Sequence, residues 1–274
     1  MLRIAIAALG LASALPAEGI KIVLVAGRPS HGPGAHEFNA GVSLLEKMLR
    51  QNKNIEPVIV RGGWPDDESV FNGARSVFFY LDGGARHPFL TDHRLQTLRS
   101  LMGKGVGLGC MHYCVEIPKE NGGPELLDWL GGYYERPYST NPINDVAATQ
   151  ASPNHEVSRG WKSFSGNDEW YYRIRFRDND PRVTPVLTAK LPKDTPNTET
   201  IAWIHRRKDG GRSFGFTGGH FHTNWGLPDF RRMVVNSILW TAKVKIPKGG
   251  ARCDISPGDL TQNLDPKPAS KKKS

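Results

Sequence analysis

The chain has 274 residues, of which 38% are hydrophobic and 23% charged, with a formal net charge of +9. This length suits one large domain or two small ones around a buried core, and the composition excludes a disordered or repetitive chain. Three cysteines are too few for a disulfide framework. The positive charge is spread along the chain rather than gathered in a stripe, so we expect no nucleic-acid partner.

The first 17 residues have the pattern of a secretory signal peptide. Arg3 gives a short positive start, an apolar run covers Ile4–Leu11, and small residues follow. The run is too short to anchor the chain in a bilayer. We therefore expect a secreted or periplasmic protein after cleavage, without stable membrane insertion. The alternative is a buried N-terminal strand or helix.

Strands and helices are predicted to alternate after residue 20. Continuous apolar runs, typical of strands buried on both faces, lie in 20–27, 55–60, 74–84 and 106–114, and helical spacing of apolar residues covers 36–52 and 91–105. This alternation predicts an α/β doubly wound fold with a mainly parallel sheet. Ligands of such sheets bind at the carboxyl ends of the strands.

The second half of the chain has a different sequence pattern. From about residue 137 the pattern is strand-like with long loops, and Lys208–Gly211 (KDGG) is a strong hairpin signal. An amphipathic helix is predicted over 228–243. Residues 247–274 are rich in Pro, Lys and Ser, which predicts a flexible basic tail.

Histidines gather at the predicted strand ends. His31 and His36 follow the first strand, His112 ends the fourth, and His220 and His222 follow the last. Neutral imidazoles with a carboxylate suit a divalent metal, zinc above all. Residues two apart on an extended segment face the same side, so we expect His112, His220 and His222 to bind the metal, with His36 as a further ligand. Alternatively, the His220/His222 pair is one core and one surface histidine.

Acidic and aromatic residues offer further candidates. Glu169 stands two residues before Tyr171 in NDEWYYRIR, and an acid among aromatics can transfer protons with a raised pKa. The same string also fits an exposed edge strand. Asn224 and Trp225 follow the histidine pair, and a tryptophan beside polar residues is a usual sugar-stacking platform, although tryptophan also fills cores.

Several motifs resemble the ThuA (trehalose-utilisation) family. They include VLVAGRPSHGPGAHEF, GLGCMHY and FGFTGGHFHTNW, and the resemblance covers residues 20–250, with the domain itself at 20–246. It implies a class I glutamine-amidotransferase-like fold, which is a flavodoxin-like three-layer sandwich, here with an added β-rich segment. The resemblance also implies a small carbohydrate substrate, a sugar oxidoreductase acting in the same pathway, and no nucleotide cofactor.

The amidotransferase triad itself is not expected. His222 falls where the triad histidine stands in that superfamily, but Asn224 replaces the glutamate. Cys110 lacks the glycine that follows the nucleophile two residues later, because His112 stands there. We therefore expect the thiol nucleophile to be replaced by a histidine cluster.

The resemblance leads to a mechanistic hypothesis. The substrate is a disaccharide or a 3-keto-glycoside, the metal polarises the ketone, and Glu169 or Tyr113 moves protons. A sugar-binding module without turnover and a hydrolase that uses Cys110 are the alternatives. The predicted catalytic residues are His112, Tyr113, Glu169 and His222. The predicted substrate contacts are His31, His36, Trp64, Asp82, Tyr171, Asn224 and Trp225.

Overall fold

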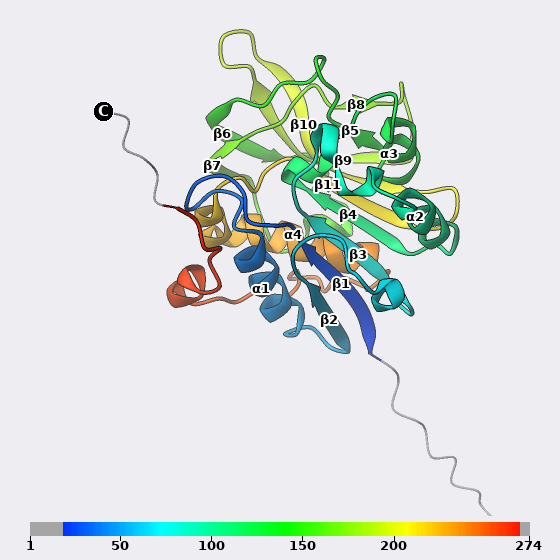
Figure 1. The fold of residues 1–274 in the computed structure, drawn as a ribbon. Helices are drawn as coiled ribbons and strands as arrows, with labels where there is room; N and C mark the ends of the chain where they lie inside the picture. Colours follow the sequence, from blue (N-terminus) through cyan, green and yellow to red (C-terminus); the bar gives the residue numbers. More distant parts are fainter. Residues whose placement is uncertain (1–18, 269–274) are drawn as a thin grey trace, which may run out of the picture.

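The computed structural model describes residues 19–268, so the predicted signal peptide at 1–17 and the end of the predicted tail at 269–274 lie outside the described residues. A nine-stranded sheet with the order β2-β1-β3-β4-β11-β10-β9-β6-β7 forms the centre of the fold (Figure 1). Its strands are β1 (Ile20–Ala26), β2 (Ile55–Val60), β3 (Ser76–Tyr80), β4 (Gly107–Met111), β6 (Ile143–Gln150), β7 (Phe164–Glu169), β9 (Val183–Leu191), β10 (Asn197–Arg206) and β11 (Arg212–Phe216).

The sheet has a parallel and an antiparallel half. β1 pairs in parallel with β2 and β3, and β4 pairs in parallel with β3 and β11. β10, β9, β6 and β7 extend the sheet by antiparallel pairing. The predicted α/β fold, with a mainly parallel sheet and an added β-rich segment, is thus confirmed. A separate two-stranded ribbon joins β5 (Gly132–Tyr133) to β8 (Arg175–Phe176).

Helices cover both faces of the parallel half and complete three layers. Ile22 and Leu24 of β1 belong to the core beneath α1 (Phe38–Leu49) and α4 (Pro228–Thr241). Val23 and Val25 belong to the core beneath α2 (Arg94–Gly103) and α3 (Gly123–Trp129). Alternate residues of a strand face opposite sides of a sheet, which explains the continuous apolar runs. Within residues 19–268 no helix has the length and apolar character needed to cross a membrane.

Trp225 lies in the core on the α1/α4 side. Its side chain is 0% exposed, and its ring centroid lies 5.3 Å from that of Phe230 and 6.5 Å from that of Tyr80. No face of the ring is open to a ligand. The prediction that Trp225 offers a sugar-stacking platform is therefore wrong, because the residue fills the core.

The segment from residue 247 to 268 packs on the domain, unlike the flexible tail that its composition predicts. Lys47 of α1 forms an ion pair with Asp259 at 2.6 Å. The backbone N–H of Asp265 donates to a carboxylate oxygen of Glu37 at 2.7 Å, and Cys253 is 1% exposed. A polar composition limits what a segment can bury alone, but here the neighbouring domain supplies the partners.

Replacing Trp225 by alanine tests the core assignment. We expect Trp225→Ala to lower the free energy of unfolding in urea by about 3–5 kcal/mol, since a large buried ring is lost and a cavity remains. Ile143→Ala is the control, because Ile143 is 54% exposed and surface substitutions change stability by less than about 0.5 kcal/mol. Equal effects of the two substitutions would contradict the assignment.

Candidate metal centre

Four potential metal ligands meet where the parallel strands and β7 end. His36 lies in the loop after β1, His112 directly follows β4, His220 follows β11, and Glu169 is the last residue of β7. One ligand atom from each residue lies within 4.8 Å of the other three. We call these four residues the ligand cluster.

The spacing inside the ligand cluster fits a small cation. His36 Nε2 lies 3.0 Å from both His112 Nε2 and His220 Nδ1, and the latter two are 3.3 Å apart. The nearer Glu169 oxygen lies 3.4 Å from His112 Nε2 and 3.2 Å from His220 Nδ1. Tetrahedral ligands bound to zinc at about 2.0–2.1 Å are about 3.3 Å from one another, so these distances match a tetrahedral site.

Outer hydrogen bonds fix the protons of two ligand histidines. His36 Nδ1 lies 2.8 Å from an Asp82 carboxylate oxygen, and His112 Nδ1 lies 2.9 Å from the carbonyl oxygen of Thr217. Both oxygens accept, so both Nδ1 atoms donate. Burial lowers the pKa of His36 to about 3, which keeps its ring neutral at pH 7. In neutral rings the two Nε2 atoms then direct lone pairs at each other, a repulsive arrangement that a cation between them relieves.

Glu169 supplies the anionic ligand and is itself held in place. Burial raises the pKa of Glu169, but the adjacent His112 and His220 rings outweigh burial and bring this pKa below its usual range. A cation in the cluster acts in the same direction. The second Glu169 oxygen accepts from the Asn141 amide at 2.9 Å, and the Tyr134 hydroxyl donates to Asn141 at 2.9 Å. Outer partners of this kind orient metal ligands.

A buried carboxylate organises the turn that carries His220. Asp168 is 0% exposed and accepts from the backbone N–H groups of Gly219 and His220 at 2.6 and 2.8 Å. It also accepts from the Asn224 side-chain amide at 2.9 Å. Asn224, predicted as a substrate contact, is therefore directed at Asp168. This positioning role of Asp168 was not predicted, because adjacent carboxylates such as Asp168 and Glu169 look equivalent in a sequence.

One side of the ligand cluster is open. The side chains of His36 and His112 are 0% exposed, whereas those of His220 and Glu169 are 10% and 19% exposed. Solvent and ligands therefore reach the cluster beside His220 and Glu169. His31 lies nearby, with its ring centroid 3.6 Å from that of His36 and 5.7 Å from that of His220. Burial lowers the pKa of His31, so this ring is neutral at pH 7.

Three histidines of the site have left-handed backbone conformations. The φ angles of His31, His36 and His112 are 61°, 49° and 56°. Such conformations cost about 1–3 kcal/mol each for residues other than glycine and concentrate at functional sites. No sequence pattern predicts this strain, because the residue type carries no signal for it.

Comparisons with known proteins point to one family. Residues 23–241 match the ThuA family, described as trehalose utilisation. The chain belongs to the ThuA family. Two similar structures are ThuA-like proteins, one from Bacteroides uniformis (16% identity, 88% of this chain and 98% of that chain covered, TM-score 0.63) and one from Parabacteroides merdae (15% identity, 89% and 99% covered, TM-score 0.60).

A more distant match is a glutamine amidotransferase from Thermotoga maritima, with 13% identity, 82% of this chain and 97% of that chain covered, and a TM-score of 0.45. No curated protein matches the chain. The family match and the two ThuA-like structures confirm the predicted ThuA resemblance. The likeness to the two ThuA-like structures supports the fold alone. The functional argument for this ThuA protein rests on its own residues.

A cavity of about 510 Å³ borders the ligand cluster of the ThuA domain through Asp82. The Asp82 side chain is 37% exposed and holds His36 on its other side. Trp64 is half-buried in the same wall, where it stacks on Phe79 and its Nε1 donates to Glu68 at 2.7 Å. Trp64 and Asp82 thus line the same cavity, and their role as substrate contacts stays a prediction. Its charged lining residues are Arg28, Asp66, Asp82, Arg86 and Arg94.

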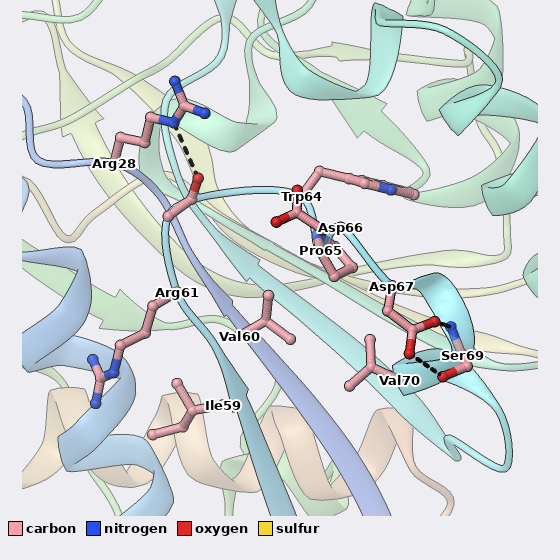
Figure 2. A pocket seen from close by; sticks show the side chains of 11 residues that line it. Arg28, Ile59, Val60, Arg61, Trp64, Pro65, Asp66, Asp67, Ser69 and Val70 are labelled. Carbon is pink, nitrogen blue, oxygen red and sulfur yellow. Dashed lines mark hydrogen bonds between the residues drawn. The ribbon is translucent and has the colours of Figure 1, made fainter.

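A second cavity, of about 610 Å³, lies beyond the end of β2. Figure 2 shows Trp64, Asp66 and Asp67 on one side of it and Arg28 and Arg61 on the other. The two cavities share Trp64, and no residue of the ligand cluster lines either of them. Only the smaller cavity contains Asp82, the hydrogen-bond partner of His36. We therefore place the candidate substrate site in the smaller cavity.

His222 does not join the ligand cluster, contrary to prediction. It begins the 3-10 helix η6 (His222–Gly226), so the chain is no longer extended and its ring diverges from that of His220. Burial lowers the pKa of His222, and the charges around it are Glu37, Lys267 and Asp265. Of the predicted pair, only His220 therefore belongs to the ligand cluster. His36 and Glu169 join it and His112 there.

The two predicted tyrosines flank the cluster. Tyr113 is partly exposed, and its ring centroid lies 6.1 Å from that of His36. Burial raises the pKa of Tyr113, so the hydroxyl keeps its proton at neutral pH. Tyr171 is 2% exposed and lies 4.9 Å from His112 between ring centroids, so it supports the site from within the core. Cys110 is a free thiol with 0% exposure.

A buried histidine outside the cluster predicts how stability depends on pH. Burial lowers the pKa of His87 to about 4, and this ring is 0% exposed. The unfolded chain, with a histidine pKa near 6.5, binds the proton more readily, so stability is complete above pH 6.5 and falls toward pH 4. We expect His87 to contribute about 1.4 kcal/mol per pH unit to this fall, measured by urea unfolding in EDTA. A slope unchanged in His87→Gln would contradict the assignment.

Proposed function

We propose that this ThuA protein binds a divalent metal, zinc above all, through His36, His112, Glu169 and His220, and uses it on a carbohydrate. The observation that carries the proposal is the pair of Nε2 atoms of His36 and His112, which face each other at 3.0 Å while both Nδ1 atoms donate elsewhere. The carboxylate-held His36 repeats the outer-shell pattern of zinc sites.

The family description, trehalose utilisation, supports a carbohydrate substrate. The cavity beside Asp82 combines guanidinium groups, carboxylates and one indole, and these groups suit a hydroxyl-rich ring. Our specific proposal is a disaccharide or a 3-keto-glycoside that a sugar oxidoreductase of the same pathway supplies. The reaction is hydrolysis, elimination or isomerisation of that sugar.

The chain's own residues have separate roles around the metal. A divalent cation bound in the cluster supplies Lewis acidity toward a carbonyl oxygen. His31 is neutral at pH 7 and stands at the open side, so it accepts a proton from the substrate carbon next to the carbonyl. Tyr113, which keeps its proton, donates a hydrogen bond to the sugar. Glu169 has both oxygens engaged, so we assign it to the metal rather than to proton transfer.

One observation favours a second candidate function. Four protein ligands complete a tetrahedral zinc site, and closed sites are usually structural. Under that alternative the metal only shapes the cavity, and the protein binds a sugar without turnover. The partial exposure of Glu169 and His220 leaves room for a fifth ligand, which favours the enzyme.

We further propose that the protein is exported, secreted or periplasmic, as the pattern of residues 1–17 indicates. N-terminal sequencing of mature protein from the medium or periplasm tests this: an N-terminus close to residue 18 is expected, and an intact Met1 in the cytoplasm would contradict it.

Metal content provides the first test. We expect one zinc ion per chain by elemental analysis, loss of the metal in His112→Ala, and an affinity about 10–100-fold lower in Asp82→Asn, because outer-shell partners have effects of this size. His93→Ala is the matched control, since His93 is an exposed histidine outside the cluster. Equal metal content in His112→Ala and His93→Ala would refute the proposed ligands.

Turnover separates the enzyme from the binding module. We expect purified protein to convert 3-keto-glycosides, EDTA to abolish conversion, and added zinc to restore it. His31→Ala should lower kcat by about 100-fold or more, the range for general acid–base catalysis, and keep its zinc. Sugar binding without conversion by the zinc-loaded protein would support the second candidate instead.

A further inference from the structure

We infer, on the basis of the proposed metal binding, that the C-terminal strap is a working part of the metal centre. The strap is defined as residues 251–268, and Lys267 in it positions the loop that carries the ligand His36. Nothing in the lysine's sequence surroundings predicts this, because Lys267 stands in a Pro- and Lys-rich stretch.

Lys267 contacts both sequence neighbours of His36. Its ammonium group donates to the backbone carbonyl oxygen of Ala35 and lies 3.2 Å from a Glu37 carboxylate oxygen. The side chains of Lys267 and Glu37 are each only 2% exposed. Glu37 also accepts from the backbone N–H groups of Gly34 at 2.8 Å and Asp265 at 2.7 Å. The strap and the loop on either side of His36 are thus one hydrogen-bonded unit.

The same loop is joined to the segment of a second ligand. Ala35 forms an antiparallel bridge with Phe221. The His36 N–H donates to the His220 carbonyl oxygen at 2.9 Å, and the His222 N–H donates to the Gly34 carbonyl oxygen at 2.9 Å. Two of the four ligands therefore lie on one short ribbon, and the Lys267 ammonium group is bonded to that ribbon.

Burial makes the Lys267–Glu37 ion pair a strong constraint. Removing one partner of a buried pair leaves an uncompensated charge, which is far more disruptive than losing a surface pair. His36 also has a left-handed backbone with φ of 49°, so its loop needs external contacts to keep this conformation. The contacts that meet this need come from the strap and from the His220 segment.

Substitution of the lysine tests the positioning role. We expect Lys267→Met to weaken zinc binding about 10–100-fold, the range for outer-shell changes, measured by competition with a chromophoric chelator. Lys248→Met is the control, because it removes the same charge from an exposed lysine. A wild-type chain that binds zinc and a Lys267→Met variant of equal affinity would overturn this inference alone. A wild-type chain without zinc affinity would overturn the proposed function as well.

A second measurement needs no variant and so remains decisive if Lys267→Met does not fold. Coupling between two sites is reciprocal, so zinc must stabilise the docked strap by the factor by which the strap strengthens zinc binding. The backbone amide of Asp265, which is bonded to Glu37, reports on docking. We expect saturating zinc to slow its hydrogen exchange about 10–100-fold. Exchange at Asp265 that zinc does not change would overturn the inference.

Discussion

The site depends on two imidazole nitrogens, Nε2 of His36 and Nε2 of His112, that face each other at 3.0 Å. Two hydrogen bonds fix this arrangement from outside. Asp82 accepts from His36 Nδ1, and the Thr217 carbonyl oxygen accepts from His112 Nδ1. In neutral rings, the lone pairs of the two Nε2 atoms repel each other when no cation lies between them. The surrounding fold then has to hold the rings together. Asp82 follows β3 and Thr217 follows β11, so the parallel sheet that positions the ligand histidines also determines their tautomers.

The antiparallel extension is as necessary to the site as the parallel half. Glu169 ends β7 at the far edge of the sheet, and Asp168 beside it binds the turn that carries His220. Asn141, which precedes β6, orients Glu169. The parallel half alone therefore offers three imidazoles, and the extension adds the charge that makes them a cation site.

The apolar runs predicted the α/β doubly wound half of the fold with its parallel strands, because strands buried on both faces have little freedom in composition. The strand ends also predicted that His36, His112 and His220 converge. The sequence could not show whether His36 or His222 is the third histidine ligand, because this depends on the 3-10 helix that begins at His222. Trp225 was misjudged for a similar reason: a tryptophan beside polar residues reads alike whether its ring faces solvent or core.

The strap was misjudged because composition describes a segment alone, whereas its stability comes from partners elsewhere in the chain. This distinction bears on how the metal centre is built. In a zinc finger the metal supplies most of the folding energy, and the site is absent without it. Here Asp168 and the Lys267–Glu37 pair hold the ligand loops by contacts that need no ion. The strain at His31, His36 and His112, at about 1–3 kcal/mol each, is thus offset by the fold before a metal arrives. Such a preorganised site spends little binding energy on ordering its ligands, and its affinity depends on residues that never touch the metal.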